Sequence, residues 1–380
     1  MKKKILFLIT EDWFFCSHFL DRALAAKNAG YEIIVCSKRN KDKINIEKFG
    51  FQFQNISFNR KNINPFYELI ILIKIIILYK KIAPDIVHHI ALKPIIYGSI
   101  AAKFNNVKAV INAPVGMGYV FTSGSLKALL LRPIMKYLLK FFLNSHQGKN
   151  KRNKVIFENK DDLNYLVNLR AVNFKDTSLI RGAGVYVREE FIENKRNNEV
   201  PIIALVGRML KDKGIYEYVE AAKELRNKNI KAKFLLIGGV DKFNSSSIKS
   251  EVLNEWHHEK IVDWLGKINN VDDVLKRIDI LCLPSYREGL PKALIEGAAM
   301  GLPIVTTNTV GCKDVVKDGV NGFLVPIKNS KALASAILKL IKDKNLRARM
   351  GKESYKLALS KFSSRIIISQ TMDIYDEMNF

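Results

Sequence analysis

Residues 278–307 read IDILCLPSYREGLPKALIEGAAMGLPIVTT and combine strand, turn and helix signals in one short unit. The apolar run at Ile278–Leu283 predicts a buried strand, and the turn residues of Pro284–Pro291 follow it. Helix-forming residues then fill Lys292–Met300, and Ile304–Thr307 predicts the next strand. The segment is therefore predicted to be a β-turn-α-β unit, and the rest of the chain can be arranged around it.

The start of the predicted helix offers unpaired backbone amides, those of Gly289, Leu290 and Lys292. Such amides form a site that favours anions such as phosphate. Two carboxylates flank this site, Glu288 in the turn and Glu296 in the middle of the helix. Because carboxylates repel phosphate, we interpret them as acceptors for sugar hydroxyls on either side of a diphosphate. The plainer alternative is an ordinary loop acid and a solvated helix residue.

The stretch SYREGLPKALIEGAAMGLPIVTT, residues 285–307, resembles the signature of the retaining, nucleotide-sugar-dependent glycosyltransferases of family 4, which have the GT-B fold. That signature is a Glu, seven residues and a second Glu, opening a helix that ends in Gly-x-Pro before a strand. The resemblance implies that Glu296 binds the donor ribose hydroxyls. It also implies that Glu288, Gly289 and Leu290 lie against the donor sugar and its diphosphate.

Two β-α-β openings about 200 residues apart predict two doubly wound α/β domains rather than one long sheet. In the first opening, the predicted strands are Lys3–Thr10 and Tyr31–Ser37, with a helix from about His18 to Asn28 between them. In the second opening, the predicted strands are Val200–Val206 and Ala232–Ile237, with a helix at Gly214–Lys228 between them. Neither contains Gly-x-Gly-x-x-Gly, which argues against a dinucleotide cofactor. We expect domains at 1–186 and 187–362, and the resemblance implies that residues 363–380 return to the first domain as a helix.

The loop after the second domain's first strand, within LVGRMLKDKG at 205–214, contains two cations, Arg208 and Lys213. Two fixed cations there would neutralise a diphosphate and stabilise it as a leaving group, without a metal ion or a cofactor. The alternative is a solvated loop with two basic residues.

The resemblance extends to this loop and to a second short stretch of the same domain. Gly207, Arg208, Lys213 and Gly214 match the family pattern for donor phosphate binding. Leu265, Gly266 and Lys267 resemble the stretch whose backbone holds the nucleobase.

In the first domain, His18 is predicted to start the first helix after an aromatic loop, Trp13–Phe15. There it could aim its imidazole, or the neighbouring helix amides, into the interdomain cleft of the GT-B fold. A capping or packing role is the alternative. Many family members have paired glycines in this loop, whereas this chain has bulky aromatic residues there.

Further acceptor-side candidates lie near the carboxyl ends of two predicted strands, where open α/β sheets bind ligands. His88 and His89 end a strand and point to opposite faces, so at most one can face a given site. Lys93 follows them in the next loop, and either His could instead be a satisfied core residue. After the next predicted strand, where many family members have a His, this chain has Asn112, and Gly116 follows it. We therefore name no general base, and transfer in this family is commonly described as needing none.

Composition and charge limit the partners of the 380-residue chain. With 48% hydrophobic residues it can form large cores, and its four scattered cysteines predict reduced, buried thiols rather than a disulfide or zinc framework. Residues 1–185 hold 30 Lys or Arg and 12 Asp or Glu, so most of the net charge of +25 lies there. Nucleic acid, anionic lipid or a phosphorylated substrate would complement this charge. A genomic bias toward Lys and Asn is the plainer explanation of part of it.

Two apolar stretches of the basic half bear on membrane contact. Leu69–Leu78 is too short to span a bilayer, and we predict a buried crossover helix there. Ser125–Leu143 has a Lys or Arg every four or five residues and a broad apolar face, which is typical of a helix lying on an anionic membrane. An ordinary helix packed on the sheet is the alternative.

Together these features predict a retaining glycosyltransferase, cytoplasmic and peripheral on the inner face of the membrane. VINAPVGMGYVFTS at 110–123 and HHIALKPIIYGSIAAK at 88–103 look like the branch that acts on undecaprenyl-diphosphate-linked saccharides. The resemblance implies a nucleotide-sugar donor that is UDP-linked and often an N-acetylhexosamine, and it implies a lipid-linked saccharide acceptor. The alternatives are an inverting GT-B transferase, a sugar-nucleotide epimerase, or a basic nucleic-acid-binding protein. No nucleic-acid motif supports the last, so we expect no nucleic-acid partner.

Overall fold

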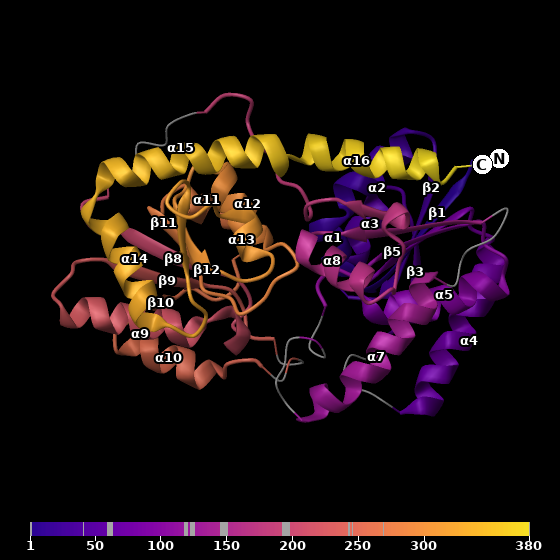
Figure 1. The fold of residues 1–380 in the computed structure, drawn as a ribbon, viewed down its shortest axis with the longest axis horizontal. Coiled ribbons are helices and arrows are strands. Elements are labelled where there is room, and N and C mark those ends of the chain that lie inside the picture. Colours follow the sequence, from indigo (N-terminus) through magenta and orange to yellow (C-terminus); the bar gives the residue numbers. More distant parts are fainter. Residues whose placement is uncertain are drawn as a thin grey trace. The chain divides into compact units, whose positions relative to one another are not determined.

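The computed structural model describes residues 2–40, 42–58, 64–117, 121, 126–144, 151–191, 198–241, 244, 246–268 and 270–379. The chain forms two compact units (Figure 1). Unit 1 comprises Met1–Ala183 and Arg365–Phe380, and unit 2 comprises Gly184–Ser364. Each unit has one parallel sheet with helices on both faces, so the predicted pair of doubly wound domains is confirmed.

The seven strands of the unit 1 sheet run in the order β3-β2-β1-β4-β5-β6-β7. They are β1 (Lys4–Glu11), β2 (Glu32–Lys38), β3 (Gln52–Asn55), β4 (Ile86–Ile90), β5 (Ala109–Ala113), β6 (Arg152–Phe157) and β7 (Thr177–Leu179). The helices are α1 (Asp12–His18), α2 (Leu20–Asn28), α3 (Lys43–Lys48), α4 (Pro65–Ile82), α5 (Leu92–Phe104), α7 (Leu126–Asn144), α8 (Lys160–Asn168), the 3₁₀ turn η1 (Phe174–Asp176) and α16 (Ser364–Glu377).

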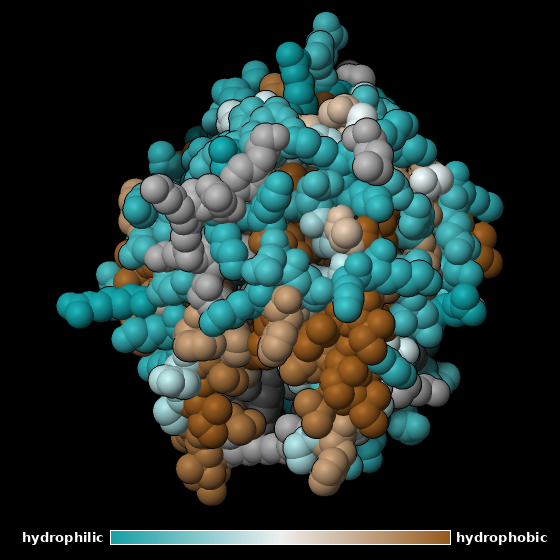
Figure 2. Space-filling model, turned by 90° about the vertical axis from the view of Figure 1, so that its right-hand side faces the viewer, coloured by the Kyte–Doolittle hydropathy of each residue, from teal (hydrophilic) through white to brown (hydrophobic). Residues whose placement is uncertain are grey.

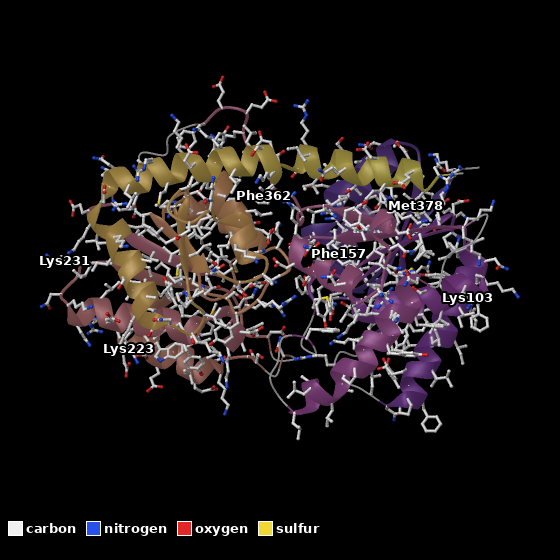
Figure 3. All side chains as sticks on the ribbon, in the orientation of Figure 1. Lys103, Phe157, Lys223, Lys231, Phe362 and Met378 are labelled. Carbon is white, nitrogen blue, oxygen red and sulfur yellow. The ribbon has the colours of Figure 1, made fainter. Side chains whose placement is uncertain are left out.

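The two faces of β1 bury different helices because successive side chains of a strand alternate. Phe7 and its neighbours two residues away face α1, α2 and α16. Leu6 and Leu8 face α4 and α5 on the opposite side. Phe157 and Met378, both labelled in Figure 3, are two of the fully or almost fully buried side chains of this unit.

The structure corrects two sequence predictions in unit 1. The segment before His18 is not a loop: it is the helix α1, and His18 is its last residue rather than the first residue of the next helix. The helix expected at Leu69–Leu78 extends over Pro65–Ile82, and only one of its faces is buried. Its Ile71, Ile75 and Tyr79 pack in the core, whereas several apolar side chains on the other face are exposed.

The unit 2 sheet has the order β10-β9-β8-β11-β12-β13. Its strands are β8 (Ile202–Val206), β9 (Lys233–Ile237), β10 (Asp263–Trp264), β11 (Ile280–Leu283), β12 (Ile304–Thr307) and β13 (Gly322–Val325). Its helices are the 3₁₀ turn η2 (Lys211–Lys213), α9 (Ile215–Asn227), α10 (Ser250–His258), α11 (Val271–Leu275), α12 (Lys292–Ala299), α13 (Cys312–Val315), α14 (Ser330–Lys342) and α15 (Lys344–Lys361). The predicted β-turn-α-β unit is present as β11, α12 and β12.

Gly297 explains how tightly that unit packs. It lies on the buried face of α12, and a Cβ atom on it would lie 2.3 Å from Cδ2 of Leu281 on β11. No real Cβ tolerates such a distance, so a side chain here would push the helix away from the sheet. The Leu281 side chain of β11 therefore packs directly against the backbone of α12 at this glycine.

Candidate active site

The order of strands in unit 2 reverses between β8 and β11. β8 pairs with β9 on one side and with β11 on the other, and the chain winds outward in both directions from this pair. The loops that follow these two strands leave the sheet at the same carboxyl edge, which is where open α/β sheets bind ligands. Arg208 and Lys213 lie in the first of these loops, and Glu288 lies in the second.

Lys213 and Glu288 form an ion pair that joins the two loops. The Nζ atom of Lys213 lies 2.5 Å from Oε1 of Glu288, and both side chains are less than one-fifth exposed. The same carboxylate oxygen accepts a hydrogen bond from Oγ of Ser285, also at 2.5 Å. An ammonium group has three protons, so Lys213 can hold Glu288 and still donate to an anion in front of it.

The loop after β11 lies close to the loops after β8 and β12, and a glycine stands at each of these two approaches. Gly214 has φ 72°, and a Cβ atom on it would lie 2.1 Å from the carbonyl oxygen of Pro284. Gly311 has φ 80°, and a Cβ atom there would lie 2.6 Å from the carbonyl oxygen of Gly289. Only glycine fits both the space and the backbone conformation at these two positions.

Arg208, the second cation of the loop after β8, pairs with an acid of unit 2 in the structure. Its Nη1 atom lies 2.7 Å from Oδ2 of Asp241, in the loop after β9, and the Arg208 side chain is 43% exposed. The structure therefore brings together Lys213 and Glu288, while Arg208 is paired on the neighbouring loop. An exposed arginine of this kind can change rotamer at small cost.

Glu296 lies in the middle of α12 and is mostly buried, so the alternative of a solvated helix residue does not hold. Its Oε1 atom lies 3.3 Å from Nζ of Lys292, one helical turn earlier. Burial raises the pKa of Glu296, and the charge of Lys292 opposes that rise. Pro291 is the N-cap residue of α12 rather than part of its first turn. The Leu290 side chain is buried in the unit 2 core, so only its backbone can face a ligand.

The remaining donor-side candidates lie at the same edge of the sheet. Gly207 follows β8, and its amide donates to the carbonyl of Ile237 at 2.9 Å. Leu265 and Gly266 follow β10; the Gly266 carbonyl accepts from the amide of Gly238 at 2.8 Å, and the Leu265 side chain is 45% exposed. The loops after β8, β9 and β10 are thus tied together by backbone hydrogen bonds.

Unit 1 has its own reversal of strand order, between β1 and β4. Lys93 lies at its carboxyl edge, in the first turn of α5 rather than in a loop. Its Nζ atom lies 2.7 Å from Oε1 of Glu68 on α4, and Tyr97 donates to the other oxygen of Glu68. Gly116 follows β5 at the same edge with φ 66°. The centre of the His18 ring lies 4.2 Å from that of the Phe14 ring, and the two rings are tilted by 36°.

His88, His89 and Asn112 have no exposed surface in the structure. The His89 ring lies 2.9 Å from Oδ1 of Asn112 and 3.0 Å from the Tyr79 hydroxyl. His88 contacts the Tyr375 hydroxyl at 3.0 Å on the opposite face, and burial holds the pKa of His88 well below its usual value. These contacts agree with the alternative that the histidines are satisfied core residues.

The sequence analysis missed several residues that shape the loop after β11. Ser285 hydrogen-bonds Glu288, and Thr307 on β12 donates to the Ser285 carbonyl. The Tyr286 hydroxyl donates to Oε1 of Glu217 on α9 at 2.6 Å. Ser285 lies inside the quoted motif and could have been singled out as a hydroxyl three residues before Glu288. The sequence around Glu217 does not indicate its role, because its partner Tyr286 is 69 residues away in the chain.

Within the described residues, no three His, Cys, Asp or Glu side chains are grouped so that they could hold a metal ion. The charged groups that the structure does bring together are one lysine and one carboxylate, Lys213 and Glu288; Arg208 lies in the same loop as Lys213, and Glu296 lies on the helix that follows Glu288. Such a set can neutralise an anion and accept hydroxyl groups at the same time. It suits a ligand that carries a phosphate group next to a sugar.

Two family models match the chain. The model of glycosyl transferases group 1 matches residues 187–357, and the 4-like glycosyl transferase model matches residues 4–146. Together they cover most of both units. The chain belongs to the group 1, family 4 type glycosyltransferases with the GT-B fold, and it is a hexosyltransferase.

Individual proteins agree with this placement. N,N'-diacetylbacillosaminyl-diphospho-undecaprenol alpha-1,3-N-acetylgalactosaminyltransferase from Campylobacter jejuni is 28% identical over 93% of each chain. UDP-Gal:alpha-D-GlcNAc-diphosphoundecaprenol alpha-1,3-galactosyltransferase from Escherichia coli is 26% identical over 84% of this chain and 82% of its own. The solved structure of HepE from Anabaena with UDP-glucose covers 98% of this chain and 99% of its own at 16% identity, with a TM-score of 0.76.

Proposed function

We propose that this glycosyltransferase moves a sugar, an N-acetylhexosamine in the first instance, from a UDP-sugar to a saccharide carried on a polyprenyl diphosphate. The reaction would retain the anomeric configuration and need no metal ion. It would serve the assembly of a cell-surface polysaccharide, lipopolysaccharide or glycan. The observation that carries the proposal is the Lys213–Glu288 pair, which joins the two loops at the strand reversal of unit 2.

The donor would lie along the carboxyl edge of the unit 2 sheet. Glu296 would accept hydrogen bonds from the ribose hydroxyls, and the backbone at Leu265 and Gly266 would hold the uracil. Gly207 and the amides near Gly289 would lie against the diphosphate, which favours a helix start. The likeness to HepE, whose solved structure contains UDP-glucose, supports this class of donor.

Lys213 would provide the main catalytic charge. As the bond between the sugar C1 and the diphosphate oxygen breaks, negative charge grows on the diphosphate, and the ammonium group stabilises it. Arg208 would add a second charge by turning from Asp241 toward the phosphate. Glu288 holds Lys213 with one oxygen, and its other oxygen would accept a sugar hydroxyl.

The acceptor hydroxyl would attack C1 from the face that the diphosphate leaves. Its proton would pass to an oxygen of the departing phosphate, so that one C–O bond forms as the other breaks and no separate base is required. The printed names of both curated relatives specify an alpha-1,3 linkage. Retention follows when the donor sugar is itself alpha-linked.

The acceptor assignment comes from these relatives. Both names describe saccharides on diphospho-undecaprenol, and the C. jejuni protein covers 93% of this chain. In unit 1, Lys93, Gly116 and His18 remain the candidates on the acceptor side.

A panel of nucleotide sugars tests the proposal. We expect purified protein to release UDP slowly from UDP-N-acetylhexosamine and much faster when a polyprenyl-diphosphate saccharide is added. NMR of the product should show the anomeric configuration of the donor. An inverted product would support an inverting transferase instead, and release of UDP with an isomerised free sugar and no transfer would support an epimerase.

The proposal places the protein at the inner face of the membrane, where α7 would contact anionic lipid. No helix in the described part of the chain is both long and apolar enough to cross a bilayer. α7 buries Ala128, Leu139 and Leu143 against unit 1, whereas Leu130 and Tyr137 are exposed on other faces. A helix that packs on one side and exposes apolar and basic residues on the other suits the headgroup layer.

Replacing both Lys136 and Lys140 by Gln should weaken binding to anionic vesicles by about thirtyfold, because each lysine near such a surface contributes about 1 kcal/mol. Vesicle sedimentation at low salt measures this. Gln at Lys344 and Lys361 on α15 of unit 2 is the matched control and should change little. Unchanged sedimentation of the α7 variant would exclude a membrane role for these lysines.

A further inference from the structure

Five apolar side chains form one exposed stripe along α4, here called the α4 stripe. It consists of Phe66 (78% exposed), Leu69 (53%), Ile70 (51%), Ile73 (46%) and Ile77 (61%). Phe66, Ile70, Ile73 and Ile77 are three or four residues apart and Leu69 adjoins Ile70, which places all five on one helix face, opposite the buried face of α4. A helix that is apolar all round is normally enclosed by protein or lipid, and this one is enclosed on one side only.

In the amino-terminal half of α4, no exposed charged side chain accompanies the α4 stripe. Its one acid is Glu68, which is mostly buried and paired with Lys93 and Tyr97 of α5. The cations of α4 come later, at Lys74, Lys80 and Lys81. The helix is therefore apolar toward its start and basic toward its end.

The surroundings of the stripe are strongly basic. Residues 86–157 contain eleven Lys or Arg and no Asp or Glu. They include α5, which packs against α4 on one side and against α7 on the other. Lys103, labelled in Figure 3, lies at the end of α5 with its Nζ atom 5.8 Å from the centre of the Phe141 ring on α7.

α7 exposes a second apolar set on the far side of α5. Leu126, Leu129, Leu130, Ile134, Tyr137 and Phe141 are between 47% and 74% exposed. Figure 2 faces unit 1 and shows hydrophobic residues gathered in two groups in its lower part, the part that α4 and α7 occupy in Figure 1. Two apolar ridges with cations between and behind them make a surface suited to an anionic bilayer.

We propose that the α4 stripe inserts into the acyl layer of an anionic membrane, while the cations of α4, α5 and α7 contact its headgroups. This rests on the proposed function only for the presence of a lipid-linked acceptor, and it adds a second, uncharged contact to the basic contact of α7. A second copy of the chain is a poorer occupant, because it would bring the same excess of positive charge against itself. An anionic membrane complements both the apolar and the basic parts.

Salt separates the two contacts, because it screens headgroup attraction but does not weaken apolar insertion. In high salt, wild-type protein should keep a residual affinity for vesicles of phosphatidylcholine and phosphatidylglycerol. Phe66→Ser with Ile70→Ser should lower that residual partitioning by about tenfold or more, since two large apolar side chains leave the lipid. Sedimentation of the full chain with vesicles measures it.

Phe174→Ser with Ile44→Ser is the matched control. These side chains have the same chemistry, are 71% and 61% exposed, and lie in unit 1 outside α4, α5 and α7. An equal loss in the control, or no loss in the α4 variant, would overturn the proposal. A dimer that only the α4 variant dissociates would show that a second copy covers the stripe instead. UDP binding, measured in parallel, tests the proposed function separately, because neither pair of substitutions lies in unit 2.

Discussion

Replacing Lys213 by Ala should lower kcat/KM for sugar transfer by at least about a hundredfold, the loss typical of removing one group that stabilises charge in a transition state. Lys213 is the cation that the structure fixes between the two loops at the strand reversal. Without it, the charge that develops on the departing diphosphate would lie near the uncompensated carboxylate of Glu288, with only Arg208 and the helix-start amides proposed above to offset it. Steady-state release of UDP in the presence of acceptor measures the effect.

Lys211 offers the matched control in the same short turn. Lys211 is exposed and lies two residues before Lys213 in η2. Among the described residues, it makes no ion pair with Glu288. Lys211→Ala should leave kcat/KM within about twofold of wild type, the range of an exposed charge. Equal losses in the two variants would mean that general charge, rather than one placed cation, drives the reaction.

Folding has to be separated from catalysis in this variant, because Lys213→Ala removes one of the two side-chain partners that the Glu288 carboxylate has among the described residues and leaves Ser285. Lys213→Arg keeps the charge at this place and should recover part of the rate. Circular dichroism and thermal unfolding should show a folded protein in both cases. Wild-type turnover by a folded Lys213→Ala protein would remove Lys213 from the catalytic site.

The sequence predicted the elements around this site well because their signals are local. The run from Ile278 to Thr307 contains its own strand, turn and helix stop, and the structure places β11, α12 and β12 there with ends that differ by at most two residues. A parallel strand buried on both faces is apolar throughout, so it stands out against the charged residues of this chain.

Errors occurred where the deciding contact is distant in the sequence. Asp12 is buried at the start of α1 because it accepts hydrogen bonds from the backbone and side chain of Asn40. Nothing near Asp12 shows this, and the aromatic residues after it suggested a loop. The pairing of Arg208 with Asp241 likewise joins residues that are distant in the sequence, and the role of Arg208 at the diphosphate stays a prediction.

α4 shows a different limit of sequence reasoning. Hydrophobic periodicity identifies the buried face of a helix when one face is apolar and the opposite face is polar. In α4, both faces carry apolar residues. The pattern could therefore not distinguish a helix enclosed by protein from one that exposes half of its apolar surface. Only the exposed fractions of Phe66 and Ile77 reveal which of the two this chain contains.

Glu296→Gln should lower the affinity for the donor while leaving the fold at least as stable as before. A carboxylate that accepts two hydroxyl groups makes charge-assisted hydrogen bonds, and replacing it by an amide should weaken UDP binding by about a hundredfold. Because the ribose is remote from the bond that breaks, the loss should appear mainly in KM rather than in kcat. Calorimetry with UDP and steady-state kinetics measure the two parts.

The effect on stability should have the opposite sign to the effect on binding. Burial raises the pKa of Glu296, so the fold disfavours its ionised form. The contribution of this group to stability is therefore present at low pH and is lost as the pH rises through the raised pKa. At neutral pH, Gln removes that cost, and the Tm of the variant should equal or exceed that of the wild type.

The pH dependence of UDP affinity should distinguish a binding role of Glu296 from a purely structural one. Wild-type UDP affinity should fall as the pH drops through the raised pKa of Glu296, because the neutral acid is a poorer acceptor, and this step should be absent in Glu296→Gln. Glu353→Gln is the control, since Glu353 also pairs with a lysine on a helix of unit 2, at 2.7 Å from Lys356. A Glu296→Gln protein with wild-type UDP affinity at neutral pH would leave Glu296 as a structural acid, and its pairing with Lys292 would then be its whole role.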